Sequence, residues 1–500
     1  MMLSLVSKAT NAVRLALLAA SLAGSTNCAP TFEGLAPVPA DKLERDFEVL
    51  RQGLEQFHTG LYRYTSKESY DREFDRARRL IDGPMNEREF FRVVAPVVTF
   101  AREGHSGTRP SEGYDHYIRT QAPLLPVAVW IRSGTVYCTE LGSPQAPDAR
   151  GASIVAINQE AIADIVTKLR RYIPTDGFIE SARDHDLGGL TFAWLYHLEY
   201  GPVERFELTV ATDDGEQTHW LDAVPLPQVE QHIEELRISR GHAHEQDFEY
   251  RVLSDDTAYL GVQTFSTISV PQRMRYRRFL RRSFRDIAAR EIETLIIDVS
   301  RNGGGNEGNE NLLFSYLANN YRKYRAVRAK TNLAVLDNGL DDPIELRAFG
   351  LFERLLFNEQ QPDGSYERRA DRGHGLTAYR NEPRIKYRGE LYVLIGPKTY
   401  SGGSEFANMI RARNRGVFVG EETGGGYYGN TSGYMRELTL PHSGLRVIIP
   451  ALLFDMNVEG PTFGRGVMPD HRVVPTIDQV LEGSNPALDY VLADLKSPRD

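Results

Sequence analysis

The chain has little of what would make a disulfide-stabilised protein. Its 500 residues include only two cysteines, Cys28 and Cys138. Cys138 stands in an apparent strand and would have no partner if the chain were cleaved after Cys28. The fold must then rest on its apolar core rather than on disulfides. We interpret Cys138 as a buried thiol rather than a nucleophile.

Excess positive charge and long internal apolar runs are also lacking. The formal net charge is -9, so the chain as a whole has no basic footprint for nucleic acid. No internal stretch approaches the roughly 20 apolar residues that a membrane helix requires. Neither an HExxH pair nor a cysteine-rich ligand set occurs, so we expect no metal and no organic cofactor.

The N-terminus carries the one strongly apolar run, from Leu15 to Ala23, after two basic residues and before small ones. This order is typical of a secretory signal peptide, and we predict that residues 1–28 direct export to the periplasm or the cell exterior. A short anchoring helix or an irregular start is the alternative. Cys28 is a candidate for lipid attachment, although Asn27 replaces the small residue expected before a lipidated cysteine.

Two regions with different periodicity follow. Between residues 31 and 118 apolar residues recur every three to four positions, which predicts a small helical domain. Asn86, with a glutamate three residues later, predicts the start of one of its helices. Residues 120–228 contain short strands and one predicted helix, from Ala161 to Arg171, which indicates a compact β-rich module.

The third region, residues 240–485, alternates apolar strands with helices and therefore predicts a mixed α/β layer architecture. We expect its helices near residues 271–291, 308–320 and 402–413. The stretch 335–385 is polar and rich in Arg, Gly and Asp, and we interpret it as an insertion or a lid.

Ser401 is the first candidate catalytic residue. A buried-strand pattern ends at Ile395, a Gly-Pro-Lys-Thr turn follows, and a helical pattern begins just after the serine. A serine at such a junction is held rigidly beside helix amides that can bind an oxyanion. The elbow of the α/β-hydrolases would need glycine in place of Thr399. From this segment alone, Ser401 is equally well explained as a nucleophile or as the N-cap of the helix.

A second candidate element is the run Gly303-Gly304-Gly305, which follows an apolar strand. Consecutive glycines let backbone amides approach a ligand closely. A phosphate-binding loop is disfavoured because no Gly-Lys-Ser/Thr follows. A flexible turn is the simpler alternative.

A serine nucleophile needs a base to accept its proton. No lysine occurs between Gly402 and Pro475, so the base must come from elsewhere. His105 is the best-placed histidine. It comes directly after a predicted helix and is flanked by Gly104 and Ser106. By itself it would usually be structural. His442 and His471 are nearer in sequence but stand in turn-like contexts.

Four separated motifs keep the order of a known family: LIIDVSRNGGG, KTYSGGSEFA, VGEETGGG and GRGVMPDHRV. Together they resemble the tail-specific (C-terminal processing) and tricorn-like serine peptidase family. The segment GASIVAINQEAIADI resembles part of a PDZ-like module. HTGLYRYT and REGHSG are similar to the helical domain of a secreted bacterial branch. The resemblance implies a peptidase core of the crotonase-like, tail-specific protease type.

The resemblance also implies roles for individual residues. Ser401 would be the nucleophile, and the amides of Gly402, Gly303 and Gly304 would form the oxyanion hole. The processing-peptidase branch uses a lysine base where this chain has Gly426. The tricorn-like branch takes a histidine from before the PDZ-like module, which matches His105.

The acid that would orient the histidine is left open. Phe463 stands where the tricorn-like pattern has a glutamate. Glu421, Glu422 and Glu459 are the candidate replacements, and the sequence does not choose among them.

We therefore expect an exported serine endopeptidase that works through a Ser-His acyl-enzyme mechanism. Its partner would be a peptide or protein substrate, bound near the C-terminus by strand addition to the PDZ-like module. We do not expect the protein to bind nucleic acid, and we expect it to bind a membrane only through a lipid on Cys28. The alternatives are a catalytically silent peptide- or ligand-binding protein on the same fold, and an esterase that uses the same dyad.

Overall fold

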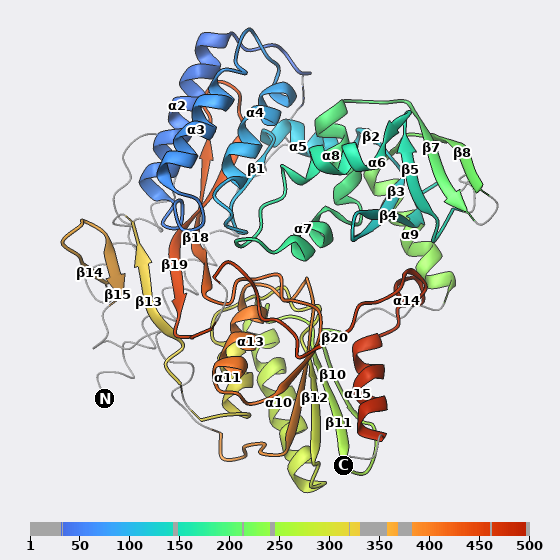
Figure 1. Ribbon diagram of the computed structural model, residues 1–500, viewed down its shortest axis with the longest axis vertical. Coiled ribbons are helices and arrows are strands. Elements are labelled where there is room, and N and C mark those ends of the chain that lie inside the picture. The colour runs from blue at the N-terminus through green and yellow to red at the C-terminus, as the bar shows by residue number, and fades with distance from the viewer. Residues whose placement is uncertain are drawn as a thin grey trace.

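The computed structural model describes residues 32, 34–143, 149–212, 215–240, 246–319, 321–330, 358–368, 383–460 and 463–496. The predicted signal peptide, Cys28 and most of the 335–385 stretch lie outside these residues. Three six-stranded sheets and a two-stranded sheet are combined with helices into a mixed α/β architecture (Figure 1). This confirms the fold class predicted from the sequence.

The core sheet has the strand order β10-β11-β12-β16-β17-β20, with all neighbours parallel except β10 and β11. Its bounds are Phe248–Val252, Thr257–Val262, Thr294–Asp298, Glu390–Ile395, Val417–Gly420 and His471–Arg472. Side chains alternate across it: Leu295 and Ile297 join one apolar cluster and Ile296 another. Such two-sided burial explains why these strands read as continuous apolar runs.

Helices cover both faces of the core sheet. Those in the first cluster are α10 (Val270–Ala289), α11 (Asn309–Ser315) and α13 (Gly402–Ala412). The C-terminal α15 (Pro486–Lys496), which follows α14 (Ile477–Glu482), packs on the other face. α11 is shorter than the helix predicted for residues 308–320, because the chain continues after Ser315 in turns.

A second sheet joins the N-terminal part of the chain to the core. It contains β1 (Gly107–Arg109), β13 (Tyr324–Ala329), β14 (Asn358–Gln360), β15 (Tyr366–Arg368), β18 (Gly429–Thr439) and β19 (Arg446–Met456). β1 pairs antiparallel with β19, with Gly107 opposite Ile448. Because His105 precedes β1 by two residues, this pairing brings it to the core.

The N-terminal helices pack against the same β18–β19 hairpin. They are α2 (Ala40–Phe57), α3 (Lys67–Arg78), α4 (Glu87–Thr99) and α5 (Glu112–Thr120). The helix start predicted at Asn86 is confirmed as a capping box: Asn86 Oδ1 accepts from Glu89 N at 3.0 Å, and Asn86 N donates to the Glu89 carboxylate at 2.8 Å.

The middle of the chain forms the third sheet, in the order β3-β4-β5-β7-β8 with β6 beside β5. These strands are Val127–Arg132, Thr135–Leu141, Ser153–Ile157, Arg205–Thr212, Gly215–Asp222 and Glu160–Ala161. The flanking two-stranded sheet pairs β2 (Pro123–Leu124) with β9 (Val224–Pro225).

The prediction of a single helix in this middle region is wrong. α6 (Ile162–Arg170) is the expected one, but α7 (Glu180–Leu187) and α8 (Thr191–Tyr200) follow it, and α9 (Leu226–Ser239) closes the region. α8 was missed because its sequence, TFAWLYHLEY, is aromatic and buried on most sides, so it has little amphipathic period.

Candidate active site

Ser401 lies at the carboxyl end of β16, immediately before α13. Its backbone has φ 50° and ψ -123°, in the positive-φ region that non-glycine residues rarely adopt. The side chain makes no capping hydrogen bond, although the residue occupies the N-cap position. The serine is thus strained and partly exposed, and its hydroxyl lacks the hydrogen bond that a helix cap would make.

Two residues of the triple-glycine turn, Gly304 and Gly305, approach neighbouring backbone so closely that only glycine fits. Gly304 has φ 96°, and a Cβ there would lie 2.7 Å from Ser401 Cβ and 2.8 Å from Gly402 N. Gly305 has φ 145°, and a Cβ there would lie 2.1 Å from Ser266 N. The glycine pattern therefore reflects close backbone contact, as expected from the sequence.

The amides of this turn do not all face the same way. Gly304 N donates to Asn302 Oδ1 at 2.9 Å, whereas the N–H groups of Gly303 and Gly402 have no acceptor within the described chain. This differs from the expectation for Gly304, whose amide is already engaged. Asn302, which the sequence reasoning missed, also accepts from Tyr400 N at 2.9 Å and so ties the turn to the serine segment.

His105 reaches the serine segment through Tyr400. The two rings lie with centroids 4.8 Å apart, and His105 Nδ1 is 3.0 Å from the Tyr400 hydroxyl. Among the described residues, no hydrogen bond joins the Ser401 hydroxyl to His105. Burial lowers the pKa of His105, while the Asp176 carboxylate and a backbone hydrogen bond at Thr431 act in the opposite direction. The net lowering favours the neutral imidazole that a general base requires.

Asp176, which the sequence reasoning missed, is the carboxylate that acts on His105. It is fully buried between α6 and α7, and its two oxygens accept from Gly104 N at 2.8 Å and from Gly426 N at 3.1 Å. It thus fastens the His105 loop to the turn at Gly426. The surrounding sequence, YIPTDGF, gives no motif that would have singled it out.

The position of the absent lysine is enclosed. A Cβ at Gly426 would lie 2.9 Å from Gly429 O, 3.5 Å from the Tyr64 hydroxyl and 3.6 Å from Asp176 Cβ. A longer side chain would collide with these groups.

Glu103 is a second buried carboxylate near His105. Its Oε2 accepts from Thr431 N at 3.1 Å and from Thr431 Oγ1 at 2.8 Å, and Arg63 Nη1 is 3.8 Å from Oε1. Burial raises the pKa of Glu103 to about 8, and the charge of Asp176 also raises it, while Arg63 lowers it. The motif REGHSG contains this residue, but nothing in the sequence marked it as buried.

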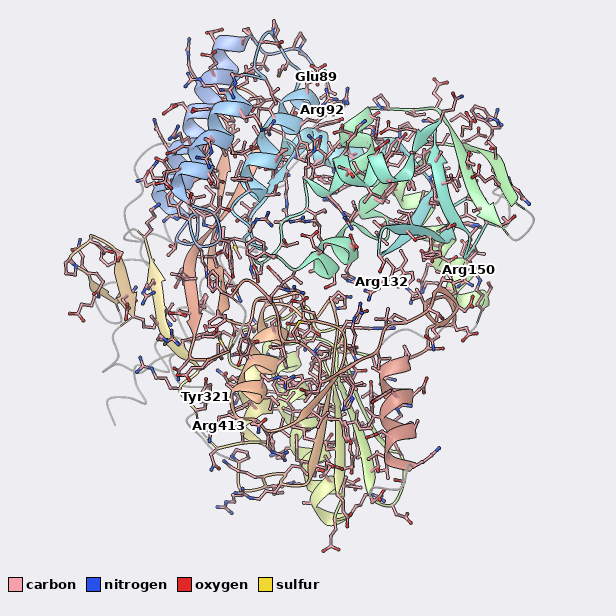
Figure 2. The ribbon with its side chains drawn as sticks, in the orientation of Figure 1. Glu89, Arg92, Arg132, Arg150, Tyr321 and Arg413 are labelled. Atoms are coloured by element: carbon pink, nitrogen blue, oxygen red, sulfur yellow. The ribbon has the colours of Figure 1, made fainter. Side chains whose placement is uncertain are left out.

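The three glutamates considered from the sequence have other surroundings. Glu421 is paired with Arg132 of β3, which Figure 2 shows on the side of the middle region that faces the core. Glu422 accepts from Arg465 Nε at 2.8 Å and from Gly466 N at 2.9 Å. Glu459 is exposed. In the described chain none of them contacts His105.

Phe463, His442 and His471, which the sequence also raised, have other partners. Phe463 is 50% exposed and packs on Tyr64, with ring centroids 5.0 Å apart. His442 N donates to Asp46, and His471 Nδ1 is 2.9 Å from the Tyr490 hydroxyl.

A buried ionic cluster lies on the other side of the serine segment. Lys323 Nζ is 2.6 Å from Glu310 Oε1 and 2.5 Å from Glu405 Oε2, and the Tyr324 hydroxyl donates to Glu405 at 2.8 Å. Lys323 is fully buried. The cluster connects α11, which follows the glycine turn, with α13, which follows Ser401.

A cavity of about 550 Å³ separates β3 from the carboxyl ends of β12, β16 and β17. Arg132, Ser300, Lys398 and Glu421 are among its lining residues, whereas Ser401 and His105 are not. The cavity adjoins the two turns that lead from β12 and β16 to the candidate site.

Two further properties concern the described residues only. No three His, Cys, Asp or Glu side chains in them converge in a way that would hold a metal ion. None of their helices is both long and apolar enough to cross a bilayer.

Comparison with known proteins gives a family and a fold. Residues 256–473 match the model of peptidase family S41. The crystal structure of mature CPAF is similar at 14% identity and TM-score 0.58, covering 91% of this chain and 97% of that one. Mature CPAF complexed with lactacystin gives 15% identity and TM-score 0.59, covering 91% and 98%. No curated protein sequence matches. The match over residues 256–473 and the shared fold support a serine-type peptidase whose core is similar to peptidase family S41.

Proposed function

We propose that this peptidase is an exported endopeptidase in which Ser401 is the nucleophile and His105 the general base. The observation that carries the proposal is the strained backbone of Ser401, held against Gly304 with His105 one side chain away. Strain at a functional serine costs about 1–3 kcal/mol and persists where the surroundings enforce it.

In the reaction His105 would take the Ser401 proton as Oγ attacks the peptide carbonyl. The resulting imidazolium would then protonate the leaving amine, which releases the first product and leaves an acyl-enzyme. Water would attack the ester by the same route. This sequence requires His105 to exchange its contact with Tyr400 for one with Ser401 when substrate binds, since catalytic hydrogen bonds are often long before substrate arrives.

The developing oxyanion would be bound by the amides of Gly402 and Gly303. Both are free to donate within the described chain, and Gly402 N is the first amide of α13, where the helix dipole favours negative charge. The amide of Gly304 donates to Asn302, so Gly304 would contribute only by letting the turn lie close to Ser401.

Asp176 would be the residue that positions His105, in place of Glu421, Glu422 or Glu459. Its two backbone hydrogen bonds fix the His105 loop, and its charge favours the imidazolium that forms during the reaction. No cofactor takes part in this mechanism.

The domain division belongs to the same proposal: a signal peptide (1–28), a helical domain (31–118), a PDZ-like module (120–228) and the peptidase core (240–485). The PDZ-like module would hold the C-terminal part of a peptide or protein substrate as an added strand. After export the protein would be periplasmic or extracellular, and a lipid on Cys28 would anchor it.

A fluorophosphonate probe tests the assignment. Wild-type protein should be labelled at Ser401, Ser401→Ala should not be labelled, and His105→Ala should be labelled at least about 100-fold more slowly. Tyr400→Phe is the matched control, because it removes the present partner of His105 but neither reacting group. If His105→Ala were labelled as fast as wild type, His105 would be rejected as the general base.

The second candidate is a silent peptide-binding protein on this fold. The contact of His105 with Tyr400 instead of Ser401 is the observation that favours it. Unlabelled wild-type protein that still binds peptides would establish this alternative, and an enzyme that cleaves esters but not peptides would establish an esterase.

A further inference from the structure

Helix α10 carries a dense array of one charge. Its 20 residues include seven arginines and one aspartate, in a chain whose net charge is -9. Six of the arginines are exposed and Arg273 is partly exposed. In the part of the chain that the structure describes, none of the seven guanidinium groups forms an ion pair or hydrogen bond. They are Arg273, Arg275, Arg277, Arg278, Arg281, Arg282 and Arg285.

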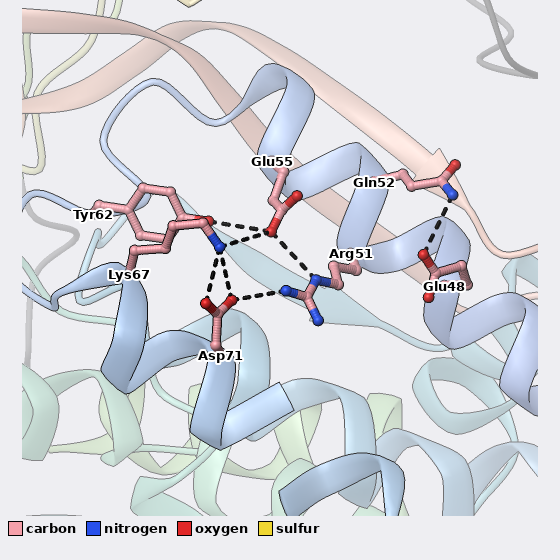
Figure 3. A network of polar contacts seen from close by, with 7 residues as sticks. All are labelled: Glu48, Arg51, Gln52, Glu55, Tyr62, Lys67 and Asp71. Atoms are coloured by element: carbon pink, nitrogen blue, oxygen red, sulfur yellow. Dashed lines mark hydrogen bonds and ion pairs between the residues drawn. The ribbon is translucent and has the colours of Figure 1, made fainter. Parts of the chain in front are cut away.

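The helices of the N-terminal region neutralise their charges differently. On α2 and α3, Arg51 binds Glu55 at 3.3 Å and Asp71 at 2.8 Å, and Lys67 binds Asp71 at 2.9 Å (Figure 3). Arg45, Arg76 and Arg78 on the same two helices also have a carboxylate partner. The contrast makes the uncompensated charge of α10 a property of that helix and not of the whole surface.

The spacing of the arginines works against the helix itself. Arg277, Arg281 and Arg285 follow one another at intervals of four, and Arg278 and Arg282 form another such pair. Like charges at this spacing lie side by side and destabilise a helix. A surface that served only for solubility would alternate the two signs.

Exposed apolar side chains lie at the start of the same face. Ile268 is 78% exposed, Val270 54% and Met274 51%. Met274 precedes Arg281 by seven residues, so both project from one face, opposite the buried Tyr276 and Leu280. Basic and apolar residues together are typical of helices that lie in a membrane interface.

The segment before α10 and the buried side of the helix contact the residues that follow the glycine turn. Thr267 N donates to Asn306 Oδ1 at 2.6 Å, directly after Gly303–Gly305, and Asn309 Nδ2 donates to Thr267 Oγ1 at 2.9 Å. The Tyr276 hydroxyl donates to Asn309 O at 3.0 Å. The start of α10 is therefore tied to the segment that follows the glycine turn.

We propose that this face of α10 docks the peptidase on an anionic lipid bilayer. The guanidinium groups would bind phosphate-bearing headgroups, and Ile268, Val270 and Met274 would enter the interface beside them. Duplex nucleic acid offers the phosphates but no apolar layer for these three side chains. The inference needs neither the catalytic assignment nor a lipid on Cys28.

Vesicle sedimentation tests the proposal with the full chain. The protein should bind phosphatidylcholine vesicles that contain phosphatidylglycerol, should not bind vesicles of phosphatidylcholine alone, and should be released by salt. The triple variant Arg277→Gln, Arg281→Gln, Arg285→Gln should partition about 100-fold more weakly. Ile268→Ser with Met274→Ser should weaken binding as well.

The matched control is Arg45→Gln, Arg72→Gln, Arg76→Gln, which removes the same charge from α2 and α3 and should bind like wild type. Thermal unfolding of each variant checks that it is folded, and all of these positions are partly or fully exposed. The proposal would be overturned if both triple variants lost vesicle binding equally, or if the α10 triple variant bound vesicles like wild type. Binding to duplex DNA but not to anionic vesicles would overturn it as well.

Discussion

Two buried acidic clusters flank Ser401, and they differ in how their charge is compensated. Glu310 and Glu405 share Lys323, which contacts both carboxylates directly. Among the described residues, Glu103 and Asp176 share no such cation: Arg63 lies 3.8 Å from Glu103, and the other partners are amides and a hydroxyl.

This difference divides the site into two halves. The half around Lys323 is held by direct ion pairs, and the half around His105 contains a carboxyl group that responds to pH. The lysine cluster joins the helices that follow the glycine turn and Ser401, so it holds these two segments in register. On the histidine side, burial raises the pKa of Glu103 to about 8, near neutral pH. The proposed base therefore lies beside a carboxyl group, that of Glu103, whose ionisation changes near neutral pH.

The largest expected effect is the loss of Lys323. Lys323→Met would leave Glu310 and Glu405 buried without their cation, and breaking a buried pair in this way costs about 3–5 kcal/mol. Urea unfolding at neutral pH should show a free energy of unfolding lower by that amount, with part of it regained on acidification as the carboxylates are protonated.

Lys42→Met, at an exposed position on α2, is the control and should change stability little. Adding Glu310→Gln and Glu405→Gln to Lys323→Met should restore part of the loss, because no charge then stays unpaired. If Lys323→Met were as stable as wild type, the cluster would not hold the two helices together.

Glu103 should give a smaller effect with a defined pH dependence. Its folded-state pKa is raised, so its contribution to stability is fully present below the ordinary glutamate pKa and is lost as pH rises toward about 8. Glu103→Gln keeps an acceptor for Thr431 but does not ionise. Urea unfolding between pH 5 and pH 8, values that bracket this window, should therefore show a shallower decline for Glu103→Gln than for wild type.

Glu44→Gln, on the exposed face of α2, should keep the wild-type slope. The same slope in Glu103→Gln and wild type would mean that Glu103 is not the group that titrates here.

The sequence predicted the local elements of the serine side far better than the contacts of the histidine side. Strand, turn, glycine and helix signals around Ser401 and Gly303–Gly305 are local, and they recur in the structure as β16, α13 and the close approach of Gly304. Asp176 and Tyr400 act on His105 only because distant segments meet, and no local pattern records that meeting. The partners of Glu421 and Glu422 were hidden for the same reason.

Asp176→Asn should have the smallest effect on stability and the most informative effect on activity. Asparagine keeps one acceptor oxygen but turns an amide toward Gly104 N or Gly426 N, which should cost about 1–3 kcal/mol. With the His105 loop less well held, kcat should fall by roughly 10- to 100-fold while KM changes little.

The pH profile of the Asp176→Asn variant distinguishes a residue that positions His105 from one that only stabilises the fold. The Asp176 charge raises the pKa of His105, so its removal should lower that pKa further, and the acidic limb of kcat/KM should move to lower pH. Asp164→Asn, exposed on α6, should leave the limb in place. A fall in kcat without movement of the limb would make Asp176 a structural residue, whereas movement in the predicted direction would show that the histidine half of the site is set by this carboxylate.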